Sequence, residues 1–299
     1  MTNSLSALAE VGKAFAPAGG AIRTEAAMLL AIDVGNTNVT LGLFPASTAR
    51  EPSARQKPSH VFRLESARNR TADEFAVLVV EMLALENVDP RAIDSAIIAS
   101  VVPPLTDTIV RLVERAFKIT PLVVGPGVKT GVAVLSDNPR EVGADRIVNS
   151  VAAHARVADL RNDAGHPFGV IVVDFGTATT FDVVSPKGEY IGGVICPGLQ
   201  ISADALFARA AKLPRVEVVK PPRVLAKNTQ HAMQSGLFYG YVGLVDGLVT
   251  RLIAEIGFPV KVLATGGLAV LIAPGSTTID EVDDDLTLDG LRIIHMRNP

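Results

Sequence analysis

Cysteine, excess charge of either sign and long hydrophobic runs are all scarce in this sequence. The one cysteine, Cys196, cannot form an intrachain disulfide, which fits a reducing cytoplasm. The 28 Lys and Arg nearly balance the 31 Asp and Glu, so the net charge of −3 gives no electrostatic argument for a nucleic acid or membrane partner. The longest apolar runs, residues 96–102 and 169–173, have the length of strands and are too short to span a bilayer. We therefore expect a cytoplasmic protein, and we expect Cys196 to be a small buried residue of a strand rather than a reactive thiol.

The composition is typical of a compact α/β protein. With 299 residues, of which 48% are hydrophobic and 20% charged, the chain is long enough for two domains that each bury a core. Residues 1–27 are rich in Ala and Gly and lack the long apolar core of a secretory signal. We interpret them as a disordered extension without chemistry, unless Met28 is the natural first residue.

Short β-rich runs alternate with amphipathic helices from Met28 onward. The expected order is three strands, a helix, a strand and a helix, and it occurs twice, once in each half. This places a first lobe at 28–141 and a second lobe at 142–299. Strands are expected at residues 28–34, 39–44, 60–65, 93–101, 169–174, 179–184, 190–195 and 260–265. Helices are expected at 71–88, where Thr71 and Glu74 form a capping box, and at 103–117, 140–157, 199–211 and 231–256.

The two halves also share a signature at the end of their first strand. Residues 30–37 and 171–178 each contain a buried strand that ends in Asp-x-Gly and a small polar residue before a second strand begins. The aspartates of the two copies, Asp33 and Asp174, are 141 residues apart. We interpret this as the duplication of a whole domain, with a chance match as the alternative.

Each of these segments has the chemistry of a phosphate site. A glycine after the aspartate lets the backbone approach a ligand, and small polar residues supply N–H and hydroxyl donors. Asp33 is well placed to hold a hydrated Mg²⁺ that bridges phosphates. An ordinary hairpin turn is the plain alternative for one copy alone, but the second copy adds a carboxylate and three hydroxyls. Two facing hairpins of this kind would hold a polyphosphate from both sides.

Two further segments complete the candidate site. The strand at 262–265 leads into Gly266 and Gly267, which open a helix and leave room for an adenosine ring, although such junctions often serve packing alone. At a helix start, Asp145 could accept a proton from a substrate hydroxyl while Arg146 binds a substrate carboxylate in two-point contact. A lone aspartate base suits the loose transition state of phosphoryl transfer. A solvated ion pair between Asp145 and Arg146 is an equally open interpretation.

With these residues in place, the sequence resembles the type III pantothenate kinases, of the superfamily that includes acetate and sugar kinases, heat-shock chaperones and actin. The resemblance runs from about Met28 to the C-terminus and rests on an ordered set of segments. They are residues 33–37, 138–146, 174–180, 192–195, 197–198, 211–214, 228–229 and 264–267. The resemblance implies two ribonuclease H-like (actin-like ATPase) lobes, each a mixed sheet with flanking helices, with the active site in the cleft between them.

The resemblance also implies an activity and a set of site residues. The activity is ATP-dependent phosphorylation of pantothenate to 4′-phosphopantothenate, the first step of coenzyme A biosynthesis, with Mg²⁺ and a monovalent cation, K⁺ or NH₄⁺. It places Asp174 at the monovalent cation and Thr177 beside the ATP phosphates. It implies a homodimer in which Thr229 reaches the partner's substrate site. The residues implied for ATP phosphates are Asp33, Val34, Gly35, Asn36, Thr37, Asn38, Val39 and Thr40, and those for pantothenate are Gly143, Ala144, Asp145 (the proton acceptor) and Arg146.

One position departs from the family pattern. Many members have a Tyr two residues before the equivalent of Asn138, where it lines the pantothenate pocket, and here that position is Ser136. A serine cannot supply the aromatic wall. Two rival functions are a kinase for a sugar or an acetate-like acid, and a non-catalytic accessory factor for transcription. The sequence around Gly143 argues against the first, and the presence of Asp33, Asp145 and Asp174 argues against the second.

Overall fold

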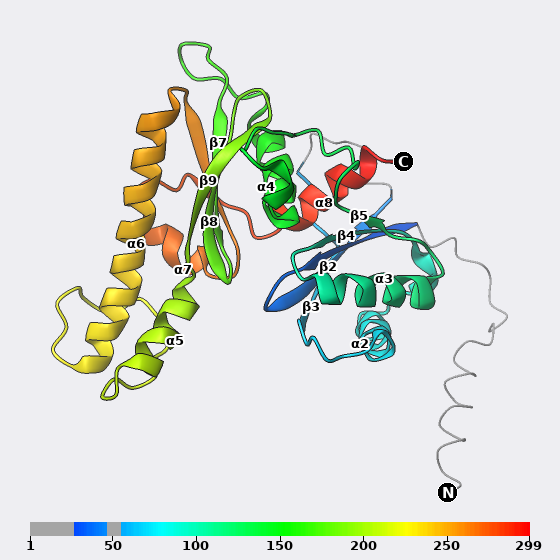
Figure 1. The fold of residues 1–299 in the computed structure, drawn as a ribbon, viewed down its shortest axis with the longest axis horizontal. Helices are drawn as coiled ribbons and strands as arrows, with labels where there is room; N and C mark the ends of the chain where they lie inside the picture. The colour runs from blue at the N-terminus through cyan, green and yellow to red at the C-terminus, as the bar shows by residue number, and fades with distance from the viewer. Residues whose placement is uncertain (1–26, 47–54) are drawn as a thin grey trace, which may run out of the picture.

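The computed structural model describes residues 27–46 and 55–299, which form two β-sheets with helices between and around them (Figure 1). The expected N-terminal extension lies, except for Ala27, outside the described residues. So does most of the loop that joins the second and third strands.

The first sheet has five strands in the order β3-β2-β1-β4-β5. Strands β1, β2 and β3 are antiparallel neighbours, whereas β4 and β5 run parallel to β1. The predictions for this half are confirmed to within one residue for β1 to β4, and the two-residue strand β5 was not predicted. The bounds are Met28–Val34 (β1), Asn38–Pro45 (β2), His60–Glu65 (β3), Ile93–Ser100 (β4) and Leu122–Val123 (β5).

The second sheet repeats this arrangement. Its order is β11-β10-β7-β8-β9-β6, in which β7, β8 and β9 are antiparallel neighbours and β10 and β11 run parallel to β7. The strands β9-β8-β7-β10-β11 therefore match β3-β2-β1-β4-β5 in order and direction, which confirms the duplication and the two-lobed α/β fold. The bounds are Ala133–Val134 (β6), Gly169–Phe175 (β7), Ala178–Val184 (β8), Glu189–Pro197 (β9), Val260–Thr265 (β10) and Glu281–Val282 (β11).

The other regular elements of the described residues are helices. Thr71 caps α2 as expected: its hydroxyl accepts the N–H of Glu74, whose carboxylate in turn accepts the N–H of Thr71 at 2.7 Å. The α-helices are Ala72–Leu85 (α2), Pro103–Phe117 (α3), Ala144–Val157 (α4), Leu199–Arg209 (α5), Thr229–Ile256 (α6), Ala269–Ile272 (α7) and Leu286–Met296 (α8). Short 3₁₀ turns lie at Pro90–Ala92 (η1), Pro139–Glu141 (η2) and Ala273–Gly275 (η3).

The prediction of one helix over 140–157 is wrong at its start. Pro139–Glu141 forms the 3₁₀ turn η2, Val142 and Gly143 have extended backbone, and α4 begins only at Ala144. The apolar Val142 continues the helical spacing of the sequence, but it packs against the buried core from an extended segment. A side chain at Gly143 would also collide with the carboxylate of Asp145, 2.5 Å from its Cβ position. Residues 142 and 143 are therefore not helical, and Gly143 lies against the side chain of Asp145 in the first turn of α4.

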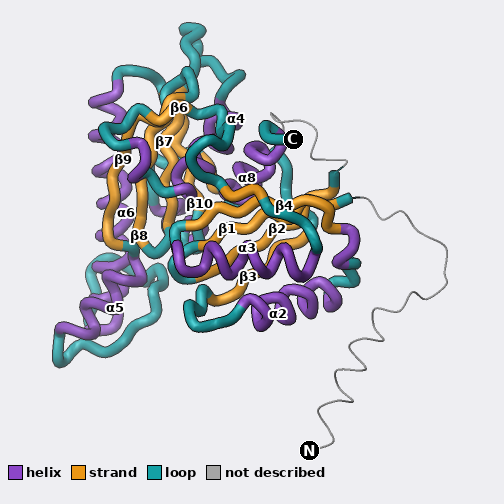
Figure 2. The backbone as a smooth tube through the Cα atoms, turned by 45° about the vertical axis from the view of Figure 1, so that its right-hand side comes forward, coloured by secondary structure: helices purple, strands orange, loops and turns teal. Residues whose placement is uncertain are grey.

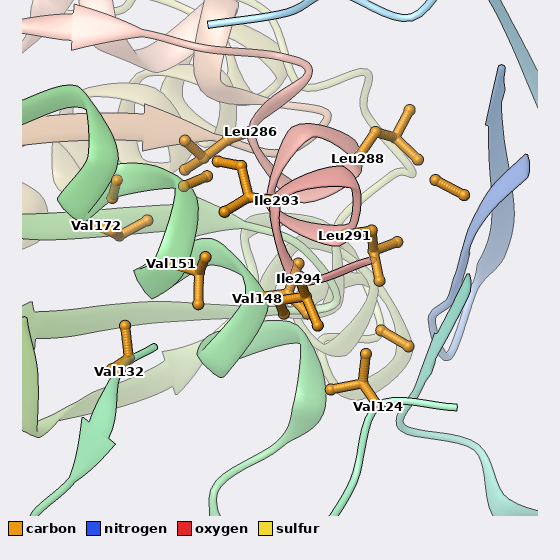
Figure 3. Close-up of a cluster of buried hydrophobic side chains, with 14 of the residues drawn as sticks. Val124, Val132, Val148, Val151, Val172, Leu286, Leu288, Leu291, Ile293 and Ile294 are labelled. Atoms are coloured by element: carbon orange, nitrogen blue, oxygen red, sulfur yellow. The ribbon is translucent and has the colours of Figure 1, made fainter. Parts of the chain in front are cut away.

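Buried side chains on the two faces of each sheet belong to different hydrophobic clusters. On β1, Leu30 and Ile32 point into a cluster with α2 and α3, whereas Leu29 and Ala31 on the opposite face join a central cluster. That central cluster contains buried residues of α4 and α8 and the inner face of β7, so the two helices lie between the sheets (Figure 3). Figure 2 shows α2 and α3 beside the first sheet and α6 beyond the second. Because both faces of each sheet are covered, the first strands are continuously apolar, as predicted.

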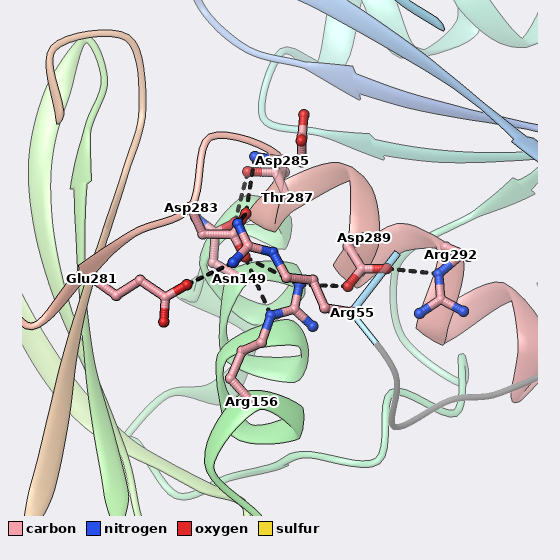
Figure 4. Close-up of polar contacts among 9 residues, drawn as sticks. All are labelled: Arg55, Asn149, Arg156, Glu281, Asp283, Asp285, Thr287, Asp289 and Arg292. Atoms are coloured by element: carbon pink, nitrogen blue, oxygen red, sulfur yellow. Dashed lines mark hydrogen bonds and ion pairs between the residues drawn. The ribbon is translucent and has the colours of Figure 1, made fainter. Parts of the chain in front are cut away.

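A buried ionic network joins the elements of this central layer (Figure 4). Asp289 of α8 is fully buried and pairs with Arg156 of α4 and with Arg292, each at 2.6 Å. Arg156 also contacts Asp283 after β11 at 3.1 Å, and Arg55, before β3, contacts the same carboxylate at 3.0 Å. The network ties the segment before β3 to the end of the second sheet. Asp283 and Asp289 each pair with two arginines, so removing one arginine leaves each carboxylate with a remaining counterpart, and the loss should be smaller than the about 3–5 kcal/mol of breaking an isolated buried pair.

The division of the chain at 141/142 stays a prediction. β6 precedes that boundary and pairs with β9 of the second sheet, whereas α8, at the other end of the chain, packs against β1 and β4 of the first. The long helix α6 packs Val245 and Val249 into the core of the second lobe. By length and composition alone α6 is apolar enough to cross a membrane, with 33% of its most apolar window buried.

Candidate active site at the ends of two matching strands

The two Asp-x-Gly hairpins face each other. In the first, the N–H of Gly35 donates to the carbonyl of Asn38 at 3.0 Å, and in the second the N–H of Gly176 donates to the carbonyl of Ala178 at 3.1 Å. Their tips meet where the hydroxyls of Thr37 and Thr177 lie 2.9 Å apart. The structure thus brings together, from the two sheets, the two segments that the sequence suggested as phosphate loops. The exposed residues at both tips leave backbone and hydroxyl donors accessible.

Three carboxylates converge behind these hairpins. Asp33 and Asp174 are each the second-last residue of their strands, β1 and β7, and Asp145 lies in the first turn of α4. Burial and repulsion from Asp145 and Asp174 raise the pKa of Asp33 to about 8. Burial and repulsion from Asp145, partly offset by a hydrogen bond from Asn149, raise the pKa of Asp174 to about 7. Burial and mutual repulsion thus disfavour the ionised form of these carboxylates, and a cation bound among them would favour it.

Asp145 occupies the position expected of a proton acceptor. Its Oδ1 accepts the backbone N–H of Arg146 at 2.8 Å, which fixes the carboxylate at the start of the helix. Burial raises the pKa of Asp145, while that N–H and the charge of Arg146 oppose the shift. A carboxylate with a raised pKa is a stronger base than one in water, so it is better matched to removing a hydroxyl proton.

Arg146 does not form a solvated pair with Asp145. Its Nε donates to Asp182 of β8 at 2.7 Å, and its guanidinium carbon lies 5.6 Å from the ring centre of Tyr190. Asp182 is fully buried, and it also accepts hydrogen bonds from Thr180 at 2.9 Å and Tyr190 at 3.1 Å. Because only Nε is engaged with Asp182, the terminal nitrogens are oriented but remain available for a planar anion. The interpretation as a solvated Asp145–Arg146 pair is therefore wrong.

Sequence reasoning missed Asp182 and Asn149. Asp182 is a charged residue in a strand whose neighbours on both sides are apolar, and that contrast was the available signal. Asn149 lies one turn after Asp145 on α4, is buried, and donates from Nδ2 to Asp174 Oδ2 at 2.9 Å. Nothing in the helical pattern distinguishes it from a polar residue on the solvent side.

Gly266 brings the end of β10 against Asp174. Its φ is +90°, and a Cβ there would lie 2.5 Å from Asp174 Oδ1, so no other residue fits without displacement. A Cβ on Gly267 would meet nothing within 4 Å, which leaves open space for a flat ring. The helix that follows the Gly pair, α7, has only four residues.

Three residues that the sequence singled out do not join this group of carboxylates. Thr229 is exposed at the first position of α6, and Figure 1 shows the start of α6 beside α5, at the opposite end of the second lobe from α4. The Oγ of Ser136 is buried and has no hydrogen-bond partner among the described residues. Cys196 lies half-buried in β9, and burial raises the pKa of its thiol, so the expectation of an unreactive strand residue is supported.

The carboxylates of Asp33 and Asp174 suit cations whose other ligands come from ATP and water. Within residues 27–46 and 55–299, no three His, Cys, Asp or Glu side chains form a group that could hold a metal alone. Mg²⁺ bound to a nucleotide needs only one or two protein carboxylates, because phosphates and water fill the other positions. Asp33 and Asp174, whose pKa values are raised by burial and by repulsion from neighbouring carboxylates, fit that requirement.

The family model and the curated relatives agree on one family. The model of the type III pantothenate kinases matches residues 29–251. Two curated relatives named type III pantothenate kinase, from Myxococcus xanthus and an Anaeromyxobacter species, are 55% and 56% identical over 271 residues, which is 91% of this chain and 99% and 100% of theirs. A solved inorganic polyphosphate/ATP-glucomannokinase from an Arthrobacter species aligns over 91% of this chain and 100% of its own, with 14% identity and a TM-score of 0.41. From the family match and these identities over 91% of the chain, the protein belongs to the type III pantothenate kinases.

Proposed function

We propose that this enzyme uses ATP to phosphorylate pantothenate to 4′-phosphopantothenate, the first step of coenzyme A biosynthesis. One observation carries the site assignment: two phosphate-type hairpins from separate sheets meet through Thr37 and Thr177, and the aspartates of both hairpins are close enough to Asp145 to be repelled by it. Family membership supports the choice of pantothenate over other alcohols. With a single cysteine, Cys196, a cytoplasmic location is the natural one.

ATP is assigned to the two hairpins. Residues 33–40 and Thr177 offer backbone N–H groups and hydroxyls to the phosphates, and the open space beside Gly267 accommodates the adenine ring. Asp33 is assigned to Mg²⁺ through water. Mg²⁺ neutralises charge on the phosphates when it is bound with ATP. In this arrangement the γ-phosphoryl group would point toward the start of α4.

Pantothenate is assigned to residues 143–146. Arg146, held in place by Asp182, binds the carboxylate of pantothenate, and the absence of a side chain at Gly143 leaves the Asp145 carboxylate unobstructed. Asp145 accepts the proton of the primary hydroxyl as that oxygen bonds to the γ-phosphorus and the bond to the ADP oxygen breaks. The proton thus moves to the Asp145 carboxylate, and the negative charge leaves with ADP.

Asp174 is assigned to a monovalent cation, K⁺ or NH₄⁺. Its half-buried carboxylate lies near Asp145 and close to the place assigned to the ATP phosphates. A cation there would screen the carboxylate from the phosphates, whose charges have the same sign.

We also propose that two copies associate through α5, α6 and the loop between them. Gly236, Gly240 and Gly243 are exposed on α6 at helical spacing, and a Cβ at any of them would meet nothing within 4 Å. Large apolar side chains are exposed nearby on Ile201, Leu206, Phe207, Val224 and Leu225. A second copy packed there would cover this surface. It would also bring Thr229 toward the neighbouring subunit, in accord with the substrate contact that the resemblance implies.

The proposed activity is tested by ADP release, measured with ATP and with or without pantothenate. The wild type should release ADP only when pantothenate is present. Asp145→Asn should lower kcat about 100-fold or more and change the pantothenate KM by less than about threefold, because general-base catalysis contributes about 10²–10⁴-fold and acts only in the transition state.

Two results would contradict the proposal. Pantothenate-independent ADP release, or release stimulated by a sugar instead, would reject the substrate. Equal and modest changes of kcat and KM in Asp145→Asn would reject Asp145 as the base.

A further inference from the structure

Asn149 connects α4 to the carboxylate of Asp174. It follows Asp145 by four residues, so it lies on the same side of the helix, and it is only 1% exposed. Its Nδ2 donates to Asp174 Oδ2 at 2.9 Å. The other carboxylate oxygen, Oδ1, lies beside Gly266. One oxygen of Asp174 is therefore tied to α4 while the other stays at the Gly266 turn.

Thr287 in turn holds the amide of Asn149. The hydroxyl of this α8 residue donates to Asn149 Oδ1 at 2.7 Å (Figure 4). An ionised carboxylate only accepts hydrogen bonds, so the amide nitrogen must face Asp174, and the amide oxygen is then the natural acceptor for Thr287. The three side chains form a directed chain in which each donor has one acceptor.

The position of Thr287 is itself fixed by packing on both sheets. Its neighbours Leu286 and Leu288 are buried in the central cluster that also contains residues of β1 and β7. Leu288 lies against Gly42 of β2, where an added Cβ would come within 2.8 Å of a Leu288 methyl carbon. Any shift of α8 relative to the first sheet would therefore move Thr287, and with it the amide that holds Asp174.

We propose that Asn149 is a positioning residue for Asp174 and that Thr287 sets the orientation of its amide. The pair fixes the Asp174 carboxylate so that its free oxygen holds the monovalent cation against the ATP phosphates. This inference rests on the proposed cation role of Asp174 and extends it to two residues that touch neither substrate. It makes α8, through Thr287, part of the nucleotide site.

The experiment compares wild type, Asn149→Ala and the matched pair Thr287→Val and Thr287→Ser. Val removes the hydroxyl at nearly constant volume, whereas Ser keeps it. Binding of a fluorescent ATP analogue, without turnover, is titrated at increasing K⁺ in a Na⁺ background, and steady-state KM values for pantothenate are measured in parallel. Unfolding temperatures establish that each variant is folded.

We expect Asn149→Ala to need about tenfold more K⁺ for half-maximal analogue binding, as expected for a lost hydrogen bond to a charged group. Thr287→Val should shift the K⁺ requirement in the same direction by about threefold, and Thr287→Ser should restore it to the wild-type value. The pantothenate KM should stay within about twofold in all of them.

Two different results separate this inference from the proposed function. If wild-type binding of the analogue is the same in K⁺ and Na⁺, the cation role of Asp174 fails and the positioning role fails with it. If the wild type depends on K⁺ but Asn149→Ala keeps the same K⁺ requirement, or Thr287→Ser behaves like Thr287→Val, only the positioning role is overturned. Should Asn149→Ala not fold, the Thr287 pair alone decides between these outcomes.

Discussion

At the scale of single residues, Asp182 fixes the orientation of Arg146. An arginine that binds a carboxylate must keep its planar group in one orientation, and its long side chain loses about 2 kcal/mol of rotamer entropy when fixed. Here the ion pair at 2.7 Å and the ring of Tyr190 fix Arg146 before substrate arrives. Preorganisation of this kind favours substrate affinity more than the chemical step.

We predict that Asp182→Asn raises the pantothenate KM about tenfold, because a hydrogen bond to a charged group contributes about 1.5–3 kcal/mol. The effect on kcat and on the ATP KM should be small, since the ATP hairpins are unchanged. Tyr190→Phe is the control: it removes one hydrogen bond at 3.1 Å and leaves the Arg146 pair intact, so its effect should be weaker. Steady-state kinetics with each substrate varied would measure both, and a parallel rise of both KM values would contradict the assignment.

The residues of the site differ in how far sequence alone could reach them. The hairpins at Asp33 and Asp174 were predictable because each one is a contiguous motif that occurs twice. Asp182, Asn149 and Thr287 act through contacts between positions 36, 25 and 138 residues apart. No local pattern encodes such pairs, so they became visible only once the strands and helices were placed in space.

At the scale of elements, the strands were predicted better than the helix ends. Strands buried on both faces are marked by apolar runs, and turns mark their limits, so β1 to β4 and β7 to β10 follow from the sequence. The predicted start of α4 was wrong because Val142 fits helical spacing although its backbone is extended. The two-residue strands β5, β6 and β11 carry too few residues for any pattern.

A second element-scale feature is the anchoring of α6 by Asp246. This carboxylate accepts hydrogen bonds from the hydroxyls of Ser276 at 2.5 Å and Thr278 at 2.8 Å and from the N–H of Thr277 at 3.1 Å. Burial alone would raise the pKa of Asp246, but these three partners lower it below its ordinary value of 3.8. Because the folded pKa is the lower one, this stabilisation is complete above pH 3.8 and is lost as the pH falls through the folded value.

We predict that Asp246→Asn lowers the free energy of unfolding by about 1–3 kcal/mol at pH 7, through loss of hydrogen bonds to a charged group. The difference from wild type should shrink as the pH falls below 4, because the wild-type carboxylate is then protonated. Urea unfolding across this pH range measures it. Asp204→Asn, which removes a carboxylate 4.0 Å from Arg215 on the surface, should change little at any pH. A difference that grew at low pH would have the wrong sign for this account.

At the scale of the whole molecule, the surface of α5 and α6 decides the assembly. We predict that Gly240→Leu weakens the dimer, because the added side chain enters space that the second copy would occupy. The same change should stabilise the folded subunit by up to about 1 kcal/mol, since Leu is a much better helix former than Gly. Weaker association of this variant could then not be attributed to unfolding of the subunit.

Sedimentation velocity over a range of concentrations would measure the shift from dimer to monomer. Val77→Leu, on the exposed surface of α2, is the control and should leave the association unchanged. If Thr229 serves the neighbouring subunit, the monomeric variant should also have a higher pantothenate KM. Identical sedimentation of Gly240→Leu and wild type would remove α6 from the interface.

The position of α8 between the sheets has a consequence during synthesis. The inner face of β1, with Leu29 and Ala31, leaves the ribosome about 260 residues before Leu286 and Ile293, which belong to the same cluster. At about 5–20 residues per second, that face waits on the order of ten seconds or more for its partner helix. A nascent first lobe is therefore exposed to chaperones and to aggregation until α8 has been synthesised. Substitutions in α8 should lower the folding yield of newly synthesised protein more than they lower the stability of the folded protein.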